Sequence, residues 1–229
     1  MPLFESERKR VLEYCDAHLP DDATVTAMFD FLQDEKLRTQ IESEYYAARY
    51  IYKLGEALAV DEDRLHAHVK FQIVQYAGIY EAIVVHLLWS VFQTSPEVTD
   101  IQFHSAYRLA TALPKTISLS TADTGEEILL CTLTRQKTTP HSIKFDDKVD
   151  AAVKIGFLDV EIGQDIKRFY KLRNAIHLES AVKFETRYEL ADSQLAYLRM
   201  QPFVLGVREF LSSGVLPAEA RAKPKPALS

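Results

Sequence analysis

The stretch "DEDRLHAHVKFQIVQYAGIYEAIVVHLLWSVF", residues 61–92, decides the fold of this chain. Apolar side chains recur along it at intervals of three and four residues, the spacing of one helical face. That stripe comprises Leu65, Val69, Ile73, Tyr76, Tyr80, Ile83, Leu87 and Val91. The pattern predicts one helix of about nine turns, nearly 50 Å long at ~1.5 Å per residue.

A helix this long and apolar also has to be tested as a membrane span. From Phe71 to Phe92 the only charged residue is Glu81, but Gln72 and Gln75 lie in the same segment. A carboxylate at the centre of a bilayer is costly. We therefore expect a buried core helix, and no membrane partner.

The segment before it predicts a second long helix, from Asp34 to Leu58, with apolar residues again three and four apart. The link between the two helices, "AVDED", is short, so they should lie antiparallel. Further upstream, residues 6–18 predict a helix, and Asp21 or Asp22 is a suitable N-cap for the helix that follows.

The middle of the chain differs from the helical segments around it. Two β-prone runs, 117–121 and 128–134, flank the turn-rich "ADTGEE", which predicts a β-hairpin over about 116–135. Helical patterns resume over 146–155, 162–176 and 192–212.

We therefore expect an all-α protein, an antiparallel helical bundle with a small β-hairpin insertion. Residues 1–60 should form a helical extension packed on the bundle, and 61–212 the bundle itself. The end of the chain, 213–229, contains "PAEARAKPKPALS", whose three prolines and missing apolar pattern predict a disordered tail.

Composition limits the classes of function. The net charge of −6 argues against a protein that coats nucleic acid through its overall field, so any polyanion must meet a local basic patch. Cys15 and Cys131 lack metal-ligand spacing, and we expect reduced, packed thiols. The start of the chain lacks the apolar core of a secretory signal, which favours the cytoplasm.

One late segment, "DIKRFYKLRNAIHLESA" (residues 165–181), concentrates polar groups that suit phosphate chemistry. Arg173 and His177 are four apart, so on a helix they would share a face. Arginine offers a planar fork of donors to phosphate oxygens, and histidine can move a proton near neutral pH. Asn174 could orient either partner. Such a set needs no metal when the nucleophile is the ribose 2′-hydroxyl of RNA.

The alternative is a polar helix C-terminus, where the macrodipole favours cations. Lys167, Arg168 and Lys171 lie just upstream and either supply a local positive field for RNA or form a solvated face. Glu81 should need a neutralising partner, for which we expect Arg173; otherwise it faces water beside Gln75.

The segment "YKLRNAIHLES" resembles the signature helix of the HEPN superfamily, whose motif is an arginine, usually a polar residue, and then a histidine. Arg173, Asn174 and His177 match these positions, with three residues between the first and last, one fewer than is usual. The apolar "GIYEAIVVHLLW" with Glu81 resembles the central helix of that family, and the likeness covers about residues 61–212.

The resemblance implies a helical homodimer in which two motifs meet and cut RNA without metal or cofactor. His177 would then handle the proton, Arg173 the scissile phosphate and Asn174 the geometry, supported by Glu81 and Tyr170. Lys167, Arg168 and Lys171 would bind RNA. It implies a cytoplasmic toxin or defence ribonuclease, with a possible antitoxin or other protein partner. The alternative is a non-catalytic module of the same fold that binds RNA or protein, or that dimerises.

Overall fold

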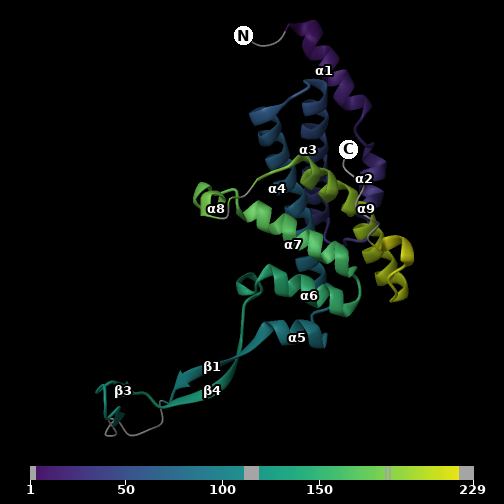
Figure 1. Ribbon diagram of the computed structural model, residues 1–229. Helices are drawn as coiled ribbons and strands as arrows, with labels where there is room; N and C mark the ends of the chain where they lie inside the picture. Colours follow the sequence, from purple (N-terminus) through teal and green to yellow (C-terminus); the bar gives the residue numbers. More distant parts are fainter. Residues whose placement is uncertain (1–3, 111–118, 184, 186, 222–229) are drawn as a thin grey trace.

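The computed structural model describes residues 4–110, 119–183, 185 and 187–221 and is mostly helical, with α4 (Glu62–His86) running through the middle (Figure 1). A π-helical turn, Leu87–Val91, continues α4. The predicted stripe is largely buried along this helix, and only its last member, Val91, is half exposed. The predicted long core helix is therefore confirmed.

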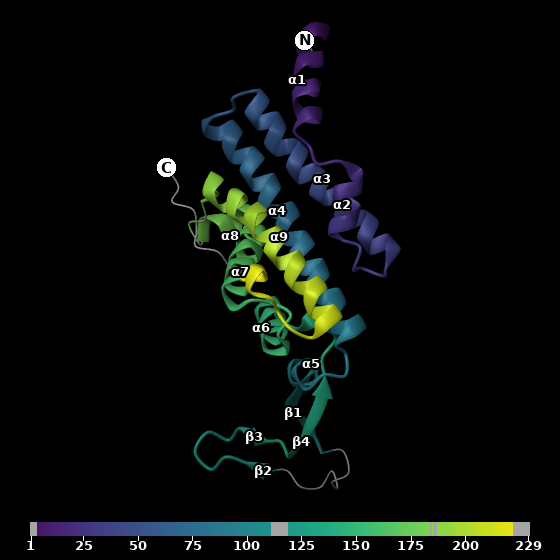
Figure 2. The ribbon, with the colours of Figure 1, turned by 90° about the vertical axis from the view of Figure 1, so that its right-hand side faces the viewer.

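The second long helix, α3 (Glu35–Ala57), packs antiparallel against α4, as the short link predicts (Figure 2). Its start is fixed by Asp34, whose carboxylate accepts a hydrogen bond from the Leu37 amide at 3.1 Å. Before it come α1 (Glu5–Ala17) and α2 (Asp22–Met28). Of the two predicted caps, Asp21 is the one used, accepting from the Thr24 amide at 2.7 Å.

Three later helices cover the remaining sides of α4. They are α6 (Phe145–Ile155), α7 (Val160–Asn174) and α9 (Leu190–Ser213). A short helix, α8 (Leu178–Lys183), which the sequence pattern does not predict, lies between α7 and α9. The predicted all-helical character is confirmed.

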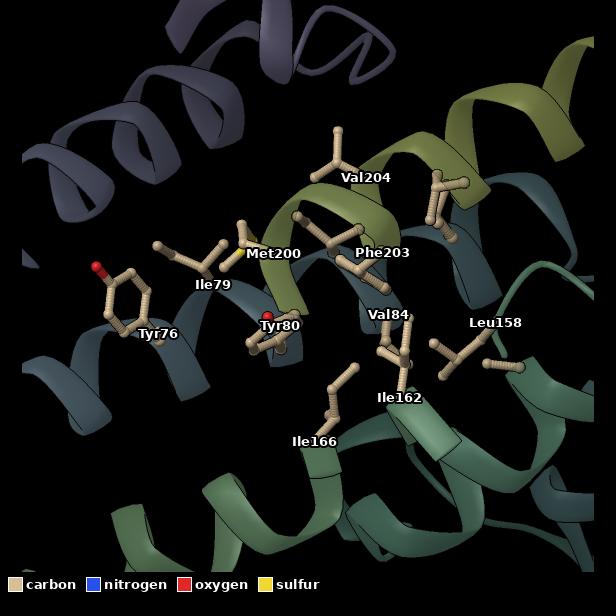
Figure 3. Packing of buried hydrophobic residues seen from close by; sticks show 14 of the residues in the cluster. Tyr76, Ile79, Tyr80, Val84, Leu158, Ile162, Ile166, Met200, Phe203 and Val204 are labelled. Atoms are coloured by element: carbon tan, nitrogen blue, oxygen red, sulfur yellow. The ribbon is translucent and has the colours of Figure 1, made fainter. Parts of the chain in front are cut away.

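The core gathers where α4, α7 and α9 meet (Figure 3). Tyr80 of α4 is fully buried, and its hydroxyl donates a hydrogen bond to the Ala196 carbonyl of α9 at 2.7 Å. The centroid of the Tyr80 ring lies 5.1 Å from that of Phe203 and 6.0 Å from that of Phe169. One tyrosine thus joins three helices through apolar contact and satisfies its polar end within the core.

α4 with its π-helical turn is the one helix of the described residues that is long and apolar enough to cross a membrane. Of its most apolar window, 56% is buried inside the protein, as in the core helix of a soluble protein. This packing agrees with the expectation of a core helix.

The β-structure forms an arm that leaves the bundle after α5 (Pro96–Gln102) and extends away from it (Figures 1 and 2). Its long ribbon pairs β1 (Phe103–Leu109) with β4 (Cys131–Lys137) in antiparallel register. A short second ribbon pairs β2 (Leu119–Ser120) with β3 (Glu127–Ile128).

The prediction of a hairpin is confirmed, but its pairing and extent are wrong. The run 128–134 does not pair as a whole with 117–121; its later part belongs to β4, whose partner is β1. The seven residue pairs between β1 and β4 form a longer ladder of backbone hydrogen bonds than the two pairs beside the local turn. Residues 117 and 118 of the predicted strand lie outside the described residues.

Two further expectations need correction. Part of the predicted disordered tail is folded, because Ala218–Ala220 forms a 3₁₀ turn and Ala220 is buried against α9. Gly206 makes this approach possible, since a Cβ at that position would lie 2.8 Å from the Leu216 side chain. Cys15 is buried as expected, but Cys131 is exposed on β4, as are most of the described residues of the two long strands.

α7 and α9 are also joined by a buried ion pair. Arg199 Nε lies 2.8 Å from the Asp165 carboxylate, and both side chains are less than 10% exposed, at 6% and 8%. Removing one charge of such a pair costs more than the pair contributes, because the other charge stays in a poorly solvated place. The packing of α7 on α9 therefore depends on both groups.

Arg199→Met should lower the free energy of unfolding by about 3–5 kcal/mol, because Asp165 loses the cation that compensates its charge. Urea unfolding followed by circular dichroism measures this loss. Lys9→Met breaks the exposed Lys9–Glu13 pair as a control, and its effect should stay within about 0.5 kcal/mol. Adding Asp165→Leu to Arg199→Met should recover part of the stability; a further loss would contradict this account.

Candidate functional site

The candidate site lies at the C-terminal end of α7. The helix begins at the Asp159 cap, whose carboxylate accepts hydrogen bonds from the Glu161 and Ile162 amides at 3.0 and 3.2 Å. It ends at Asn174, and the Ala175 amide donates to the carbonyls of the preceding turn. These bonds close the helix two residues earlier than the sequence pattern predicts.

His177 therefore lies in the turn between α7 and α8, not on the helix. The prediction that helical spacing places it on one face with Arg173 is wrong. The sequence offers no glycine or proline after Arg173 to announce the helix end, which is why the pattern misses it. The backbone of the turn between α7 and α8, and not helical geometry, therefore determines where His177 lies.

Arg173 pairs with Glu81, as predicted from the need to neutralise that carboxylate. The distance from Arg173 Nη1 to the Glu81 carboxylate is 3.0 Å, and the side chains are 35% and 26% exposed. The guanidinium also lies 5.6 Å from the ring centroid of Tyr170, which in turn packs on Phe145. Glu81 thus holds Arg173 in one place while leaving it open to solvent.

A second cation acts on Glu81 from α6. Lys148 is only 5% exposed, and burial lowers its pKa, while the charge of Glu81 acts in the opposite direction. Its ammonium lies 5.7 Å from the Trp89 ring centroid. Sequence reasoning missed this lysine, although its position three residues after Phe145 and four before Ala152 places it on the apolar face of the helix.

Asn174 and His177 are both exposed at this helix end. Within the part of the chain that the structure describes, neither side chain forms a hydrogen bond or an ion pair. The turn itself is held, because Lys70 of α4 donates to the Ile176 carbonyl at 3.3 Å and the Tyr188 hydroxyl donates to the Leu172 carbonyl at 3.0 Å. An amide and an imidazole are therefore free for a ligand on a fixed support.

The three upstream cations of α7 are paired with carboxylates. Lys167 lies 2.5 Å from Asp150, Lys171 lies 3.6 Å from Asp146, and Arg168 pairs with Asp192. The positive field expected beside Arg173 is consequently offset by acids from α6 and α9. The Lys171 pair joins exposed groups and is the easiest for a polyanion to replace.

The arrangement suits an anion better than a cation. Arg173 uses one nitrogen on Glu81, and its fork has further donors for phosphate oxygens. Among the described residues, no three histidine, cysteine, aspartate or glutamate side chains form a group that could hold a metal. Arg173, Asn174 and His177 thus lie within five residues of one another at the end of α7, and Glu81 and Tyr170 lie beside the arginine.

Comparison with models of protein families, with curated proteins and with solved structures finds no match to this chain. The resemblance to the HEPN superfamily therefore depends on the short motif at the end of α7 and on the helical pattern around it.

Proposed function

We propose that this chain is a metal-independent endoribonuclease of HEPN type, acting in a prokaryotic defence or toxin–antitoxin system. The observation that carries the proposal is the fixed, solvent-open Arg173, held by Glu81 one residue before an exposed Asn174 and four before an exposed His177. Arginine, amide and imidazole are the groups that RNA cleavage through the 2′-hydroxyl needs.

In the proposed reaction, the ribose 2′-oxygen attacks the adjacent phosphorus and His177 accepts the proton of that hydroxyl. The bond from phosphorus to the 5′-oxygen breaks as the new bond forms, and the leaving oxygen takes a proton from a general acid. The products are a 2′,3′-cyclic phosphate and a 5′-hydroxyl. Arg173 compensates the negative charge that builds on the non-bridging oxygens.

A homodimer would supply the general acid that one chain lacks. One His177 cannot be base and acid in the same step, so a second copy across a twofold axis would provide the protonated imidazole. The cations of α7 would exchange their acidic partners for RNA phosphates, Lys171 most readily because its pair is exposed.

The second candidate is a non-catalytic helical module that binds RNA or protein, or that dimerises. The ion pairs favour it: Arg173 is engaged by Glu81, and Lys167, Arg168 and Lys171 each have a carboxylate partner. In that case the same residues serve the packing of α7, and RNA is bound without turnover.

His177→Ala should reduce cleavage of total tRNA by about 100-fold or more, the range typical of a lost general base. The measurement is the yield of products ending in 2′,3′-cyclic phosphate, in the presence of a chelator, with the oligomeric state followed by light scattering. His141→Ala removes an exposed histidine from the 3₁₀ turn Pro140–Ser142 and is the matched control, with activity unchanged.

Unchanged cleavage by His177→Ala would remove this residue from the mechanism. Binding of tRNA by the wild-type protein without any cleavage would instead support the non-catalytic module.

Arg173→Lys should lower the rate about 100-fold even though the charge is kept, because an ammonium lacks the planar fork that holds Glu81 and the phosphate together. Single-turnover cleavage at saturating RNA separates this loss from weaker binding. Arg64→Lys, at an exposed position in the first turn of α4, is the control and should cleave normally. A rate equal to that of the wild type would show that the fork is not used.

A further inference from the structure

A pocket of about 550 Å³ lies at the edge of the core, where α3, α4 and the start of α9 meet and Arg168 of α7 reaches them. α4 packs against both of its neighbours here (Figure 2). The volume of the pocket falls in the range of small-molecule sites, about 300–1,000 Å³. Arg173, Asn174 and His177 do not line it; of the residues proposed to act on RNA, Arg168 alone does, and its charge is paired with Asp192.

The walls are aromatic and hold one arginine. Arg49 of α3 lies over the Tyr197 ring, 3.9 Å from its centroid, and 5.3 Å from that of Tyr52. Tyr76 closes the floor, with its ring 6.2 Å from that of Tyr197. An arginine stacked face-on keeps the donors at the edge of its guanidinium available.

Two buried polar atoms in this pocket lack a well-aligned partner. Arg49 Nε and the Tyr76 hydroxyl are shielded from solvent and form no hydrogen bond of good geometry with the described residues, although Arg49 is near enough to oppose the rise that burial causes in the pKa of Tyr76. Tyr76 is only 1% exposed, and its hydroxyl points away from the cluster around Tyr80 and Phe203 (Figure 3). Buried donors are nearly always satisfied, and one acceptor atom of a ligand placed here would satisfy both of these groups.

The charged side chains that line the pocket balance in number, three cations against three carboxylates, but they are not all paired with one another. Lys53 pairs with Glu56 at 2.6 Å and Arg168 with Asp192, whereas Arg49 forms no ion pair with the residues that the structure describes. Glu189 adds an exposed carboxylate at the rim. A ligand with one negative charge can therefore pair with Arg49, whereas a second negative charge would face the three carboxylates of the lining with no further unpaired cation.

We propose that this pocket binds a small planar organic acid as its monocarboxylate. The carboxylate accepts hydrogen bonds from Arg49 and Tyr76, and the ring of the ligand packs on Tyr52 and Leu198. This inference does not depend on the proposed ribonuclease activity.

The test is isothermal titration calorimetry of the full-length protein with indole-3-acetate as the probe. One probe should bind per chain, and indole-3-acetamide, which has the same ring but no charge, should bind at least about tenfold more weakly. Adenosine 5′-monophosphate tests a phosphate ligand, and its second negative charge should also make it bind more weakly than indole-3-acetate.

Variants assign the binding to this pocket. Arg49→Gln should weaken it about tenfold or more, and Lys36→Gln, which removes the same charge at an exposed position on the same helix, should not. Tyr76→Phe removes only the hydroxyl and should weaken binding severalfold. Leu198→Trp keeps every charge and fills the pocket from a position that is 49% exposed, so it should fold and abolish binding.

Three results would overturn the proposal. They are absence of saturable binding by indole-3-acetate, equal binding of the amide, and full binding by the Leu198→Trp protein. Tighter binding of adenosine 5′-monophosphate than of indole-3-acetate would overturn the choice of a monocarboxylate.

Discussion

The structure depends on the need of α4 to bury apolar surface around most of its circumference. No single neighbour can cover such a helix, so α3, α6, α7 and α9 all pack against it. From Phe71 to the end of α4, Glu81 is the one charged residue, and a carboxylate in that setting requires a cation nearby. Arg173 meets that requirement, and the candidate site at the end of α7 is a consequence of how α4 is covered.

The sequence predicts the parts of the fold that local patterns determine. Helical spacing gives the long helices to within a few residues, and Asp21 caps α2 as one of the two residues predicted for that role. It fails where distant segments decide the outcome. β4 pairs with β1 across some twenty intervening residues, and the local turn at 121–126 does not reveal that partner.

The candidate site likewise has features that the sequence predicts and features that it does not. The Glu81–Arg173 pair is predictable because a half-buried carboxylate demands a cation, whichever helix supplies it. The residue at which α7 ends is not, since the basic residues there favour a helix end but no glycine or proline fixes where it falls. Nor is the pocket beside Arg49, because its walls come from four helices whose relative rotation no spacing rule specifies. Acidic partners from α6 and α9 likewise neutralise cations that look free in the sequence.

The ribbon of β1 and β4 has a consequence for the behaviour of the protein at high concentration. Within the described residues each of these strands is paired on one side only, so both outer edges present backbone groups that a strand from another molecule could join. Tyr107 and Leu133 are exposed on this ribbon and would add apolar contact. Arg108, Arg135 and Lys137 oppose such strand addition, since stacking identical edges would bring like charges together.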